Sequence, residues 1–290
     1  MNTNTATVYL NGKFLPQDQA FVPVMDRGFV FGDGVYEVIP VYGGRLFRLD
    51  EHLRRLNDSL AGIRLNNPMS AGEWTGILNR IVAENGAGEQ SVYLQLTRGH
   101  APRDHGFPED TQATIFISSS PLTPVADELL KNGVAAISLE DIRWKYCHIK
   151  AIALLPNILL RQQAIEAGAQ EAILIRDGLI TEGAASNLFM VKDGLIKTPA
   201  KGPFLLPGIT RDLVLELAAA NNIQYQEGSF GLDELQQADE IWLSSSTKEV
   251  LPVTRLDDKA VGNGQPGPVW QRMRRLYQDY KQALIAGEAE

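Results

Sequence analysis

The stretch from Ser118 to Pro124, SSSPLTP, is the feature that most constrains how this chain can fold. Its serines and prolines resist both helices and the interior of a sheet. The chain has 290 residues, which is enough length for two domains. We therefore predict an N-terminal α/β domain over residues 1–119, an interdomain linker over 120–126 and a C-terminal α/β domain over 127–290.

Turn and helix signals occur in both halves of the chain. Asn-Gly at 11–12, between two short apolar runs, is typical of a tight β-hairpin. Asp50 is a candidate N-cap for one helix, and Ser70 with Glu73 forms a capping-box pattern for the next. In the second half, strands are predicted at 134–139, 172–175 and 240–244, and helices at 156–167, at 210–220 and from 268. Because strands and helices mix without a strict βαβ rhythm, we assign the α/β (α+β) class in a two-domain, mainly antiparallel form.

The composition excludes several kinds of partner. The net charge is -8 and the basic residues form no dense run, so we expect neither nucleic acid nor an anionic membrane as a partner. No apolar run approaches a membrane span, no metal-ligand spacing is present, and the N-terminal MNTNTATVYL lacks the features of a signal peptide. Cys147 is the single cysteine, which rules out an internal disulfide and favours a cytoplasmic protein. An unpaired cysteine is more often a small buried side chain than a nucleophile.

A lysine in apolar company is the main chemical signal. Lys150 follows Ile149 and precedes the run AIALL, so its ammonium is expected in apolar surroundings that lower its pKa. A lysine that loses its proton near neutral pH can form Schiff bases and move protons. Lys145 lies five residues earlier, and in an extended segment this spacing would put the two lysines on opposite faces. The alternative for Lys150 is a side chain whose stem covers apolar surface while its ammonium reaches water.

Four further features can hold an anionic cofactor. Residues 208–210 come immediately before a predicted helix, where free N–H groups and the helix dipole favour a phosphate. The hydroxyl run LSSST from Leu243 ends a strand, and Arg55 can add a charged guanidinium. Glu182, in front of a small-residue turn, can face a ring nitrogen. Taken alone, each is more often an ordinary helix start, serine turn, helical arginine or solvated glutamate.

Together and in order, these motifs resemble the pyridoxal-phosphate-dependent aminotransferases of fold type IV, a group that holds D-amino acid transaminases, branched-chain aminotransferases and aminodeoxychorismate lyases. The likeness covers nearly the whole chain and is carried by DRGFVFGDGVYEV from Asp26, LRRL from Leu53, IK from Ile149, TEGAASNLF from Thr181, LPGITR from Leu206 and SSST from Ser244. The resemblance implies a two-domain fold type IV enzyme with pyridoxal 5'-phosphate at the domain interface. It also implies a homodimer, because in the family the loop after residue 100 serves the neighbouring subunit's site.

By this resemblance, Lys150 is the catalytic lysine that joins the cofactor as a Schiff base, and Glu182 is the partner of the pyridine nitrogen. The implied phosphate site comprises Arg55, Ile209, Thr210 and Ser246. A desolvated lysine, a carboxylate and separate anion donors suit this cofactor, because its ring stores electrons while the protein positions it.

The D-amino acid transaminases are the nearest match within the group. The resemblance places the substrate carboxylate on Tyr36, Arg103 and His105, whose phenol, guanidinium and imidazole suit a carboxylate. Branched-chain members usually carry an arginine where this chain has Pro40, which counts against the L-branched-chain alternative. We therefore expect transamination of D-amino acids with a 2-oxo acid acceptor, of the type D-alanine plus 2-oxoglutarate giving pyruvate plus D-glutamate. An L-branched-chain aminotransferase and an aminodeoxychorismate lyase remain the alternatives.

Overall fold

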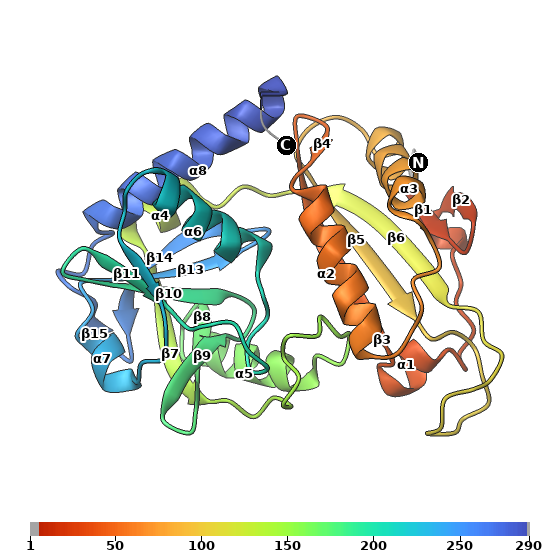
Figure 1. Ribbon diagram of the computed structural model, residues 1–290, viewed down its shortest axis with the longest axis horizontal. Coiled ribbons are helices and arrows are strands. Elements are labelled where there is room, and N and C mark those ends of the chain that lie inside the picture. Colours follow the sequence, from red (N-terminus) through yellow and green to blue (C-terminus); the bar gives the residue numbers. More distant parts are fainter. Residues whose placement is uncertain (1–5, 289–290) are drawn as a thin grey trace. The chain divides into compact units, whose positions relative to one another are not determined.

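Residues 6–288 are described by a computed structural model, in which the chain forms two compact units (Figure 1). The first contains the described parts of Met1–Thr123 and Ala283–Glu290 together with Ile149–Ala153, and the second contains Pro124–His148 and Leu154–Gln282. The lysine segment therefore folds with the first unit, although the sequence assigned it to the C-terminal domain. Residues 289–290 and residues 1–5, the first half of the N-terminal segment that lacks the features of a signal peptide, lie outside the described part of the chain.

The first unit is an antiparallel sheet with two helices across one face. The strand order is β2-β1-β6-β5-β3-β4. Its elements are β1 (Thr7–Leu10), β2 (Lys13–Pro16), the 3-10 helix η1 (Gln17–Gln19), α1 (Arg27–Phe31), β3 (Gly34–Tyr42), β4 (Arg45–Leu46), α2 (Leu49–Gly62), α3 (Ala71–Glu84), β5 (Gln90–Thr97) and β6 (Thr114–Pro121). Helices α2 and α3 lie over the sheet (Figure 1), and the core between them includes Leu56, Trp74 and Ile39.

Local signals in the sequence explain two elements of this unit. Asn11 and Gly12 adopt φ angles of 48° and 90° in the turn between β1 and β2, so the predicted Asn-Gly hairpin is confirmed. Ser70 and Glu73 form the predicted capping box at the start of α3, with Ser70 N donating to Glu73 Oε2 at 2.8 Å.

Two local predictions in this unit are wrong. Helix α2 begins one residue before Asp50, which lies in the first turn, near the positive end of the helix dipole, rather than at the N-cap. Strand β6 continues to Pro121 and includes serines that were expected to resist a sheet. Ser119 pairs with Val92, and its hydroxyl donates to Gln90 Oε1 at 2.6 Å, which satisfies the buried hydroxyl.

The second unit is a larger mixed sheet. Its strand order is β12-β11-β10-β13-β14-β7-β8-β9, with β15 paired to β14. The pairs β11–β12, β14–β7 and β7–β8 are parallel, and the other named pairs are antiparallel. Its elements are α4 (Asp127–Asn132), β7 (Val134–Glu140), α5 (Leu155–Glu166), β8 (Glu171–Arg176), β9 (Leu179–Gly183), β10 (Asn187–Lys192), β11 (Leu195–Thr198), α6 (Ile209–Ala220), β12 (Tyr225–Glu227), α7 (Leu232–Gln236), β13 (Glu240–Ser245), β14 (Glu249–Leu256), β15 (Lys259–Ala260) and α8 (Pro268–Ala286).

The two sheets confirm the α/β (α+β) class and the mainly antiparallel pairing. The core of the second unit joins its sheet to α7 through side chains such as Ile173, Met190 and Leu235. Within residues 6–288, no helix has both the length and the apolar character that crossing a bilayer requires.

Candidate active site

Lys150 lies in a short segment that extends the sheet of the first unit. The amide of Tyr36 donates to the carbonyl of Lys150 at 3.0 Å, and the amide of Ile152 donates to the carbonyl of Gly34 at 3.1 Å. The amide of Lys150 donates to Ser59 Oγ at 3.1 Å. The lysine side chain is half-buried, and its Nζ lies 4.1 Å from the centroid of the Tyr36 ring. Backbone bonds to β3 and a side chain of α2 therefore fix the position of this lysine.

Lys145 differs from Lys150, but not for the reason given by the spacing. Lys145 is exposed and belongs to the second unit, whereas Lys150 is half-buried in the first. Residues 141–150 form no strand, so the alternation of faces along an extended segment does not apply. The face argument is wrong, and the irregular path of the chain separates the two lysines.

Arg55 is fixed by a buried carboxylate on β3. Its Nε donates to Glu37 Oε1 at 2.9 Å and its Nη2 to Glu37 Oε2 at 2.7 Å, while His52 Nδ1 lies 2.7 Å from the same Oε2. All three side chains are buried. Burial would raise the pKa of Glu37, but Arg55 and His52 outweigh it and hold that pKa at about 2. Burial lowers the pKa of His52, so the neutral ring donates its Nδ1 proton to Glu37.

Glu182 is held in a buried polar cluster of the second unit. Its Oε1 accepts from Arg143 Nη1 at 2.5 Å, its Oε2 accepts from Asn187 Nδ2 at 3.0 Å, and the amide of Leu206 lies 3.1 Å from both oxygens. Arg143 also donates to both oxygens of Asp141 at 2.9 Å. Burial raises the pKa of Glu182 to about 7, against the lowering effect of Arg143. Glu182 is therefore a buried carboxyl that can change charge near neutral pH, rather than a solvated turn glutamate.

The start of α6 can bind an anion in the same unit. Gly208 is the N-cap of α6 and no side chain caps the helix, so the N–H groups of Ile209 and Thr210 lie at an end that favours negative charge. A Cβ on Gly208 would lie 2.0 Å from Asn187 Oδ1, so the close approach of these two segments requires glycine.

The end of β13 adds hydroxyl groups next to this helix start. Ser244 pairs with Asn187 in the ladder between β13 and β10. The Ser244 hydroxyl is buried and has no hydrogen-bond partner within the described chain. Ser246 lies in the turn that follows β13. A buried hydroxyl without a partner is unfavourable by itself, so it marks a place where a polar ligand would be stabilised.

Arg103 and His105 lie on the loop between β5 and β6, and both are exposed. The Arg103 guanidinium carbon lies 5.3 Å from the centroid of the Phe31 ring, and the His105 ring centroid lies 5.4 Å from it. Tyr36 lies on β3 beside Lys150. Within one chain, Tyr36 therefore contacts Lys150, whereas Arg103 and His105 contact Phe31.

Cys147 is a buried thiol that contacts the backbone of Trp144. Its Sγ lies 3.2 Å from the carbonyl oxygen of Trp144, and burial raises its pKa to about 11. The thiol is protonated at neutral pH, and a thiol in that state is a poor nucleophile.

Four residues that hold the predicted site residues in place were not predicted from the sequence. Glu37, His52, Arg143 and Asn187 hold the predicted site residues, but no local motif marks them. Glu37 could have been found, because it shares the buried face of its strand with the apolar Val35 and Ile39. A carboxylate on such a face needs a cation as its partner. For Arg143 and Asn187 the signal lies in contacts between distant segments.

Comparison with known proteins identifies the class. The family model of amino-transferase class IV matches residues 34–256. The chain belongs to this family, the class IV aminotransferases. Among curated proteins, it is 42% identical over 272 residues to a D-alanine aminotransferase of Bacillus licheniformis, which covers 94% of this chain and 96% of that protein. It is 40% identical over 277 residues to a D-alanine aminotransferase of Listeria monocytogenes, covering 93% and 94% of the two chains.

Two solved structures share the fold. A branched-chain amino acid aminotransferase of Escherichia coli matches with a TM-score of 0.91 at 29% identity, covering 99% of this chain and 96% of that one. A T.th. branched-chain amino acid aminotransferase, solved with pyridoxamine 5'-phosphate, matches with a TM-score of 0.90 at 26% identity, covering 98% and 95%.

Proposed function

We propose that this class IV aminotransferase transfers the amino group of D-amino acids to a 2-oxo acid, with pyridoxal 5'-phosphate as its cofactor. D-Alanine with 2-oxoglutarate is the substrate pair we expect. The D-alanine aminotransferases that match 94% and 93% of the chain support this substrate class. The observation in the structure that carries the proposal is the buried Glu182 carboxylate, held by Arg143 and Asn187 close to an uncapped helix start.

The donor groups of the second unit fit this cofactor. A pyridine nitrogen needs an anionic or acidic partner in a dry site, which Glu182 supplies with a pKa of about 7. A phosphate needs N–H and hydroxyl donors, which the start of α6 and the serine hydroxyls at and just after the end of β13 can supply. We assign the phosphate to Arg55, Ile209, Thr210 and Ser246. The related T.th. enzyme solved with pyridoxamine 5'-phosphate supports this choice of cofactor.

In the proposed reaction, the site residues bind the cofactor, move the proton and orient the substrate. When bound, the cofactor supplies an electron-accepting ring that makes the Cα–H bond of an amino acid acidic. Lys150 would hold the cofactor through its amine when no substrate is bound, and the freed amine would be the base that takes the Cα proton of the amino acid. Glu182 holds a proton at the ring nitrogen. Tyr36, Arg103 and His105 orient the substrate carboxylate, which decides whether a D- or an L-amino acid presents its proton to the lysine.

We also propose that the chain works as a homodimer in the cytoplasm. Each unit exposes large apolar side chains that a monomer would leave in water. In the first unit Phe21, Val24 and Phe29 are 79%, 72% and 78% exposed, and in the second Leu155 and Ile158 on α5 are 66% and 60% exposed. A second copy of the chain is the partner that we expect to cover them. The cytoplasmic location is supported by the absence of any second cysteine that could form a disulfide within the chain.

An L-branched-chain aminotransferase is the second candidate, because the solved E. coli enzyme of that name has a TM-score of 0.91 to this chain. The two functions are separated by assaying D-alanine and L-leucine, each with 2-oxoglutarate, and by resolving the chirality of the glutamate that is formed. We expect D-alanine to react and to give D-glutamate. Reaction of L-leucine alone would reject the D-amino acid assignment and leave the aminotransferase class intact.

A further inference from the structure

The loop between β5 and β6 is held by a buried arginine that no step of the proposed reaction uses. Arg27, the first residue of α1, is 4% exposed. Its Nη1 donates to the carbonyl oxygens of Asp104 at 2.6 Å and Gly106 at 3.2 Å, on either side of His105. One guanidinium nitrogen therefore fixes the backbone of the tip of the loop, next to Arg103 and His105, the two predicted carboxylate ligands on this loop.

Asp33 fixes Arg27 from the other side. The Asp33 carboxylate accepts from Arg27 Nε at 2.8 Å and from Arg98 Nε and Nη2 at 2.8 and 3.1 Å. Burial would raise the pKa of Asp33, but the two arginines outweigh it and hold that pKa below its usual value. Arg98 Nη2 also donates to the carbonyl of Ile63 at 2.7 Å, at the end of α2. The guanidinium of Arg27 is thus held by a charged pair that is anchored in the helical layer.

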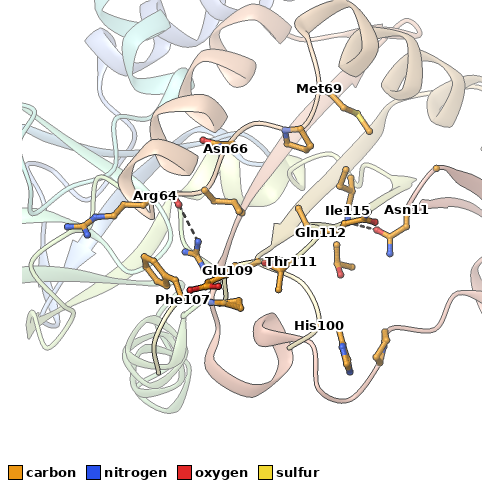
Figure 2. A pocket seen from close by; sticks show the side chains of 18 of the residues that line it. Asn11, Arg64, Asn66, Met69, His100, Phe107, Glu109, Thr111, Gln112 and Ile115 are labelled. Atoms are coloured by element: carbon orange, nitrogen blue, oxygen red, sulfur yellow. Dashed lines mark hydrogen bonds between the residues drawn. The ribbon is translucent and has the colours of Figure 1, made fainter. Parts of the chain in front are cut away.

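The part of the loop that follows the anchored tip borders a pocket. The side chains of Phe107, Glu109 and Thr111 line a pocket of about 870 Å³ that also contacts Arg64 and Asn66 (Figure 2). There the Phe107 ring packs on Arg98, whose guanidinium carbon lies 3.8 Å from the ring centroid, so the arginine that braces Asp33 also supports the loop.

Helix α1 also supplies the surface on which the two ligands rest. Phe31, at its last position, lies 4.9 Å from the Arg27 guanidinium carbon, and the same ring contacts Arg103 and His105. The anchor and the platform are therefore parts of one short helix.

We propose that Arg27, braced by Asp33, is the positioning residue that sets the loop in the conformation that binds the substrate carboxylate. This inference rests on the proposed function, in which Arg103 and His105 bind that carboxylate. Arg27 touches neither substrate nor cofactor in this assignment. It acts through the backbone of residues 104–106, so its loss changes substrate binding and leaves the cofactor in place.

The test compares Arg27→Met and Arg27→Lys with Arg272→Met, a control that removes another arginine bonded to a backbone carbonyl, that of Asn221. For Arg27→Met we expect the KM for D-alanine to rise about tenfold with a smaller change in kcat, because the ligands are displaced and the catalytic groups are not. Hydrogen exchange at residues 101–113 should be faster in this variant, and the absorption of the bound cofactor should be unchanged. The KM of Arg27→Lys should lie between those of Arg27→Met and wild type, because lysine keeps the positive charge beside Asp33 but lacks the planar guanidinium with its several donors.

Arg103→Ala separates failure of this inference from failure of the proposed function. A raised KM in Arg103→Ala with wild-type KM and exchange in Arg27→Met would overturn the positioning role alone. Wild-type KM in both variants would show that the loop does not bind the carboxylate, so the positioning role and the carboxylate assignment would fail together. Absence of any reaction of the wild type with D-alanine would instead reject the proposed function. If Arg27→Met does not fold, Arg27→Lys decides the question, because it keeps the positive charge beside Asp33 and loses the guanidinium nitrogen that bonds the carbonyls of Asp104 and Gly106. A wild-type KM and wild-type exchange in Arg27→Lys would overturn the positioning role.

Discussion

Glu37 and Glu182 are two buried carboxylates whose pKa values move in opposite directions. Glu37 receives two bonds from one guanidinium and one from His52, and its pKa falls to about 2. Glu182 shares its arginine with Asp141, whose negative charge adds to the effect of burial, and its pKa rises to about 7. The charges and hydrogen bonds around each carboxylate, rather than burial alone, therefore decide which group stays ionised.

Glu37→Gln should destabilise the apoprotein by about 3 kcal/mol at pH 7, because it breaks a buried ion pair and leaves Arg55 without its anion. The folded pKa of Glu37 lies below its unfolded value, so its contribution is complete above that unfolded value and is lost as pH falls toward about 2. The difference in unfolding free energy between wild type and variant should therefore shrink as urea unfolding is repeated from pH 7 down to pH 3.

Glu84→Gln is the matched control, because Glu84 pairs with Arg80 on the solvent side of α3. It should cost no more than about 0.5 kcal/mol. A Glu37→Gln cost as small as that of the control would show that the buried pair contributes little to the fold.

At the scale of the elements, the sequence predicted turns and helix ends correctly where their stabilising contacts lie between neighbouring residues. The Asn11-Gly12 turn and the capping box at Ser70 depend on residues within a few positions, and both were predicted. The extension of β6 through Ser119 depends on an acceptor on β5, which no neighbouring residue reveals. The placement of Lys150 depends on bonds to β3, more than 100 residues earlier in the chain, so the sequence offers Lys150 as a candidate but does not give the reason for its position.

Gly208→Ala should disturb the site through Asn187, because the added Cβ would lie 2.0 Å from Asn187 Oδ1. We expect a loss of about 1 to 3 kcal/mol in stability, since neither segment can accept the methyl without shifting. Titration with pyridoxal phosphate should show weaker binding, because Asn187 would no longer hold Glu182 and the start of α6 would move.

Gly76→Ala provides the comparison within a helix interior, where nothing lies within 4 Å of the added Cβ. It should stabilise α3 by about 0.5 to 1 kcal/mol and leave cofactor binding unchanged. Equal cofactor affinity in Gly208→Ala and Gly76→Ala would contradict the assignment of the α6 start.

At the scale of the whole molecule, the proposed dimer makes each site depend on two chains. By the proposal, Lys150 of one copy works with Arg103 of its partner. A Lys150→Ala chain mixed with an Arg103→Ala chain should then form dimers in which one of the two sites is intact. After unfolding and refolding together, random pairing should restore about a quarter of wild-type activity at low D-alanine.

Refolding each variant alone is the control for this experiment. Lys150→Ala should be inactive, and Arg103→Ala should be active only at high substrate concentration. No gain on mixing, with dimers present by light scattering, would show that both residues serve the site of their own chain.

The attachment of the cofactor to Lys150 is the claim on which the account depends most. Lys248 is the main competitor in the second unit, because burial and the nearby Arg161 lower its pKa. Borohydride reduction of the protein loaded with pyridoxal phosphate, followed by peptide mass mapping, decides between them. We predict a single adduct on the peptide that contains Lys150; an adduct on Lys248 or Lys145, or a protein that binds no chromophore, would contradict the account.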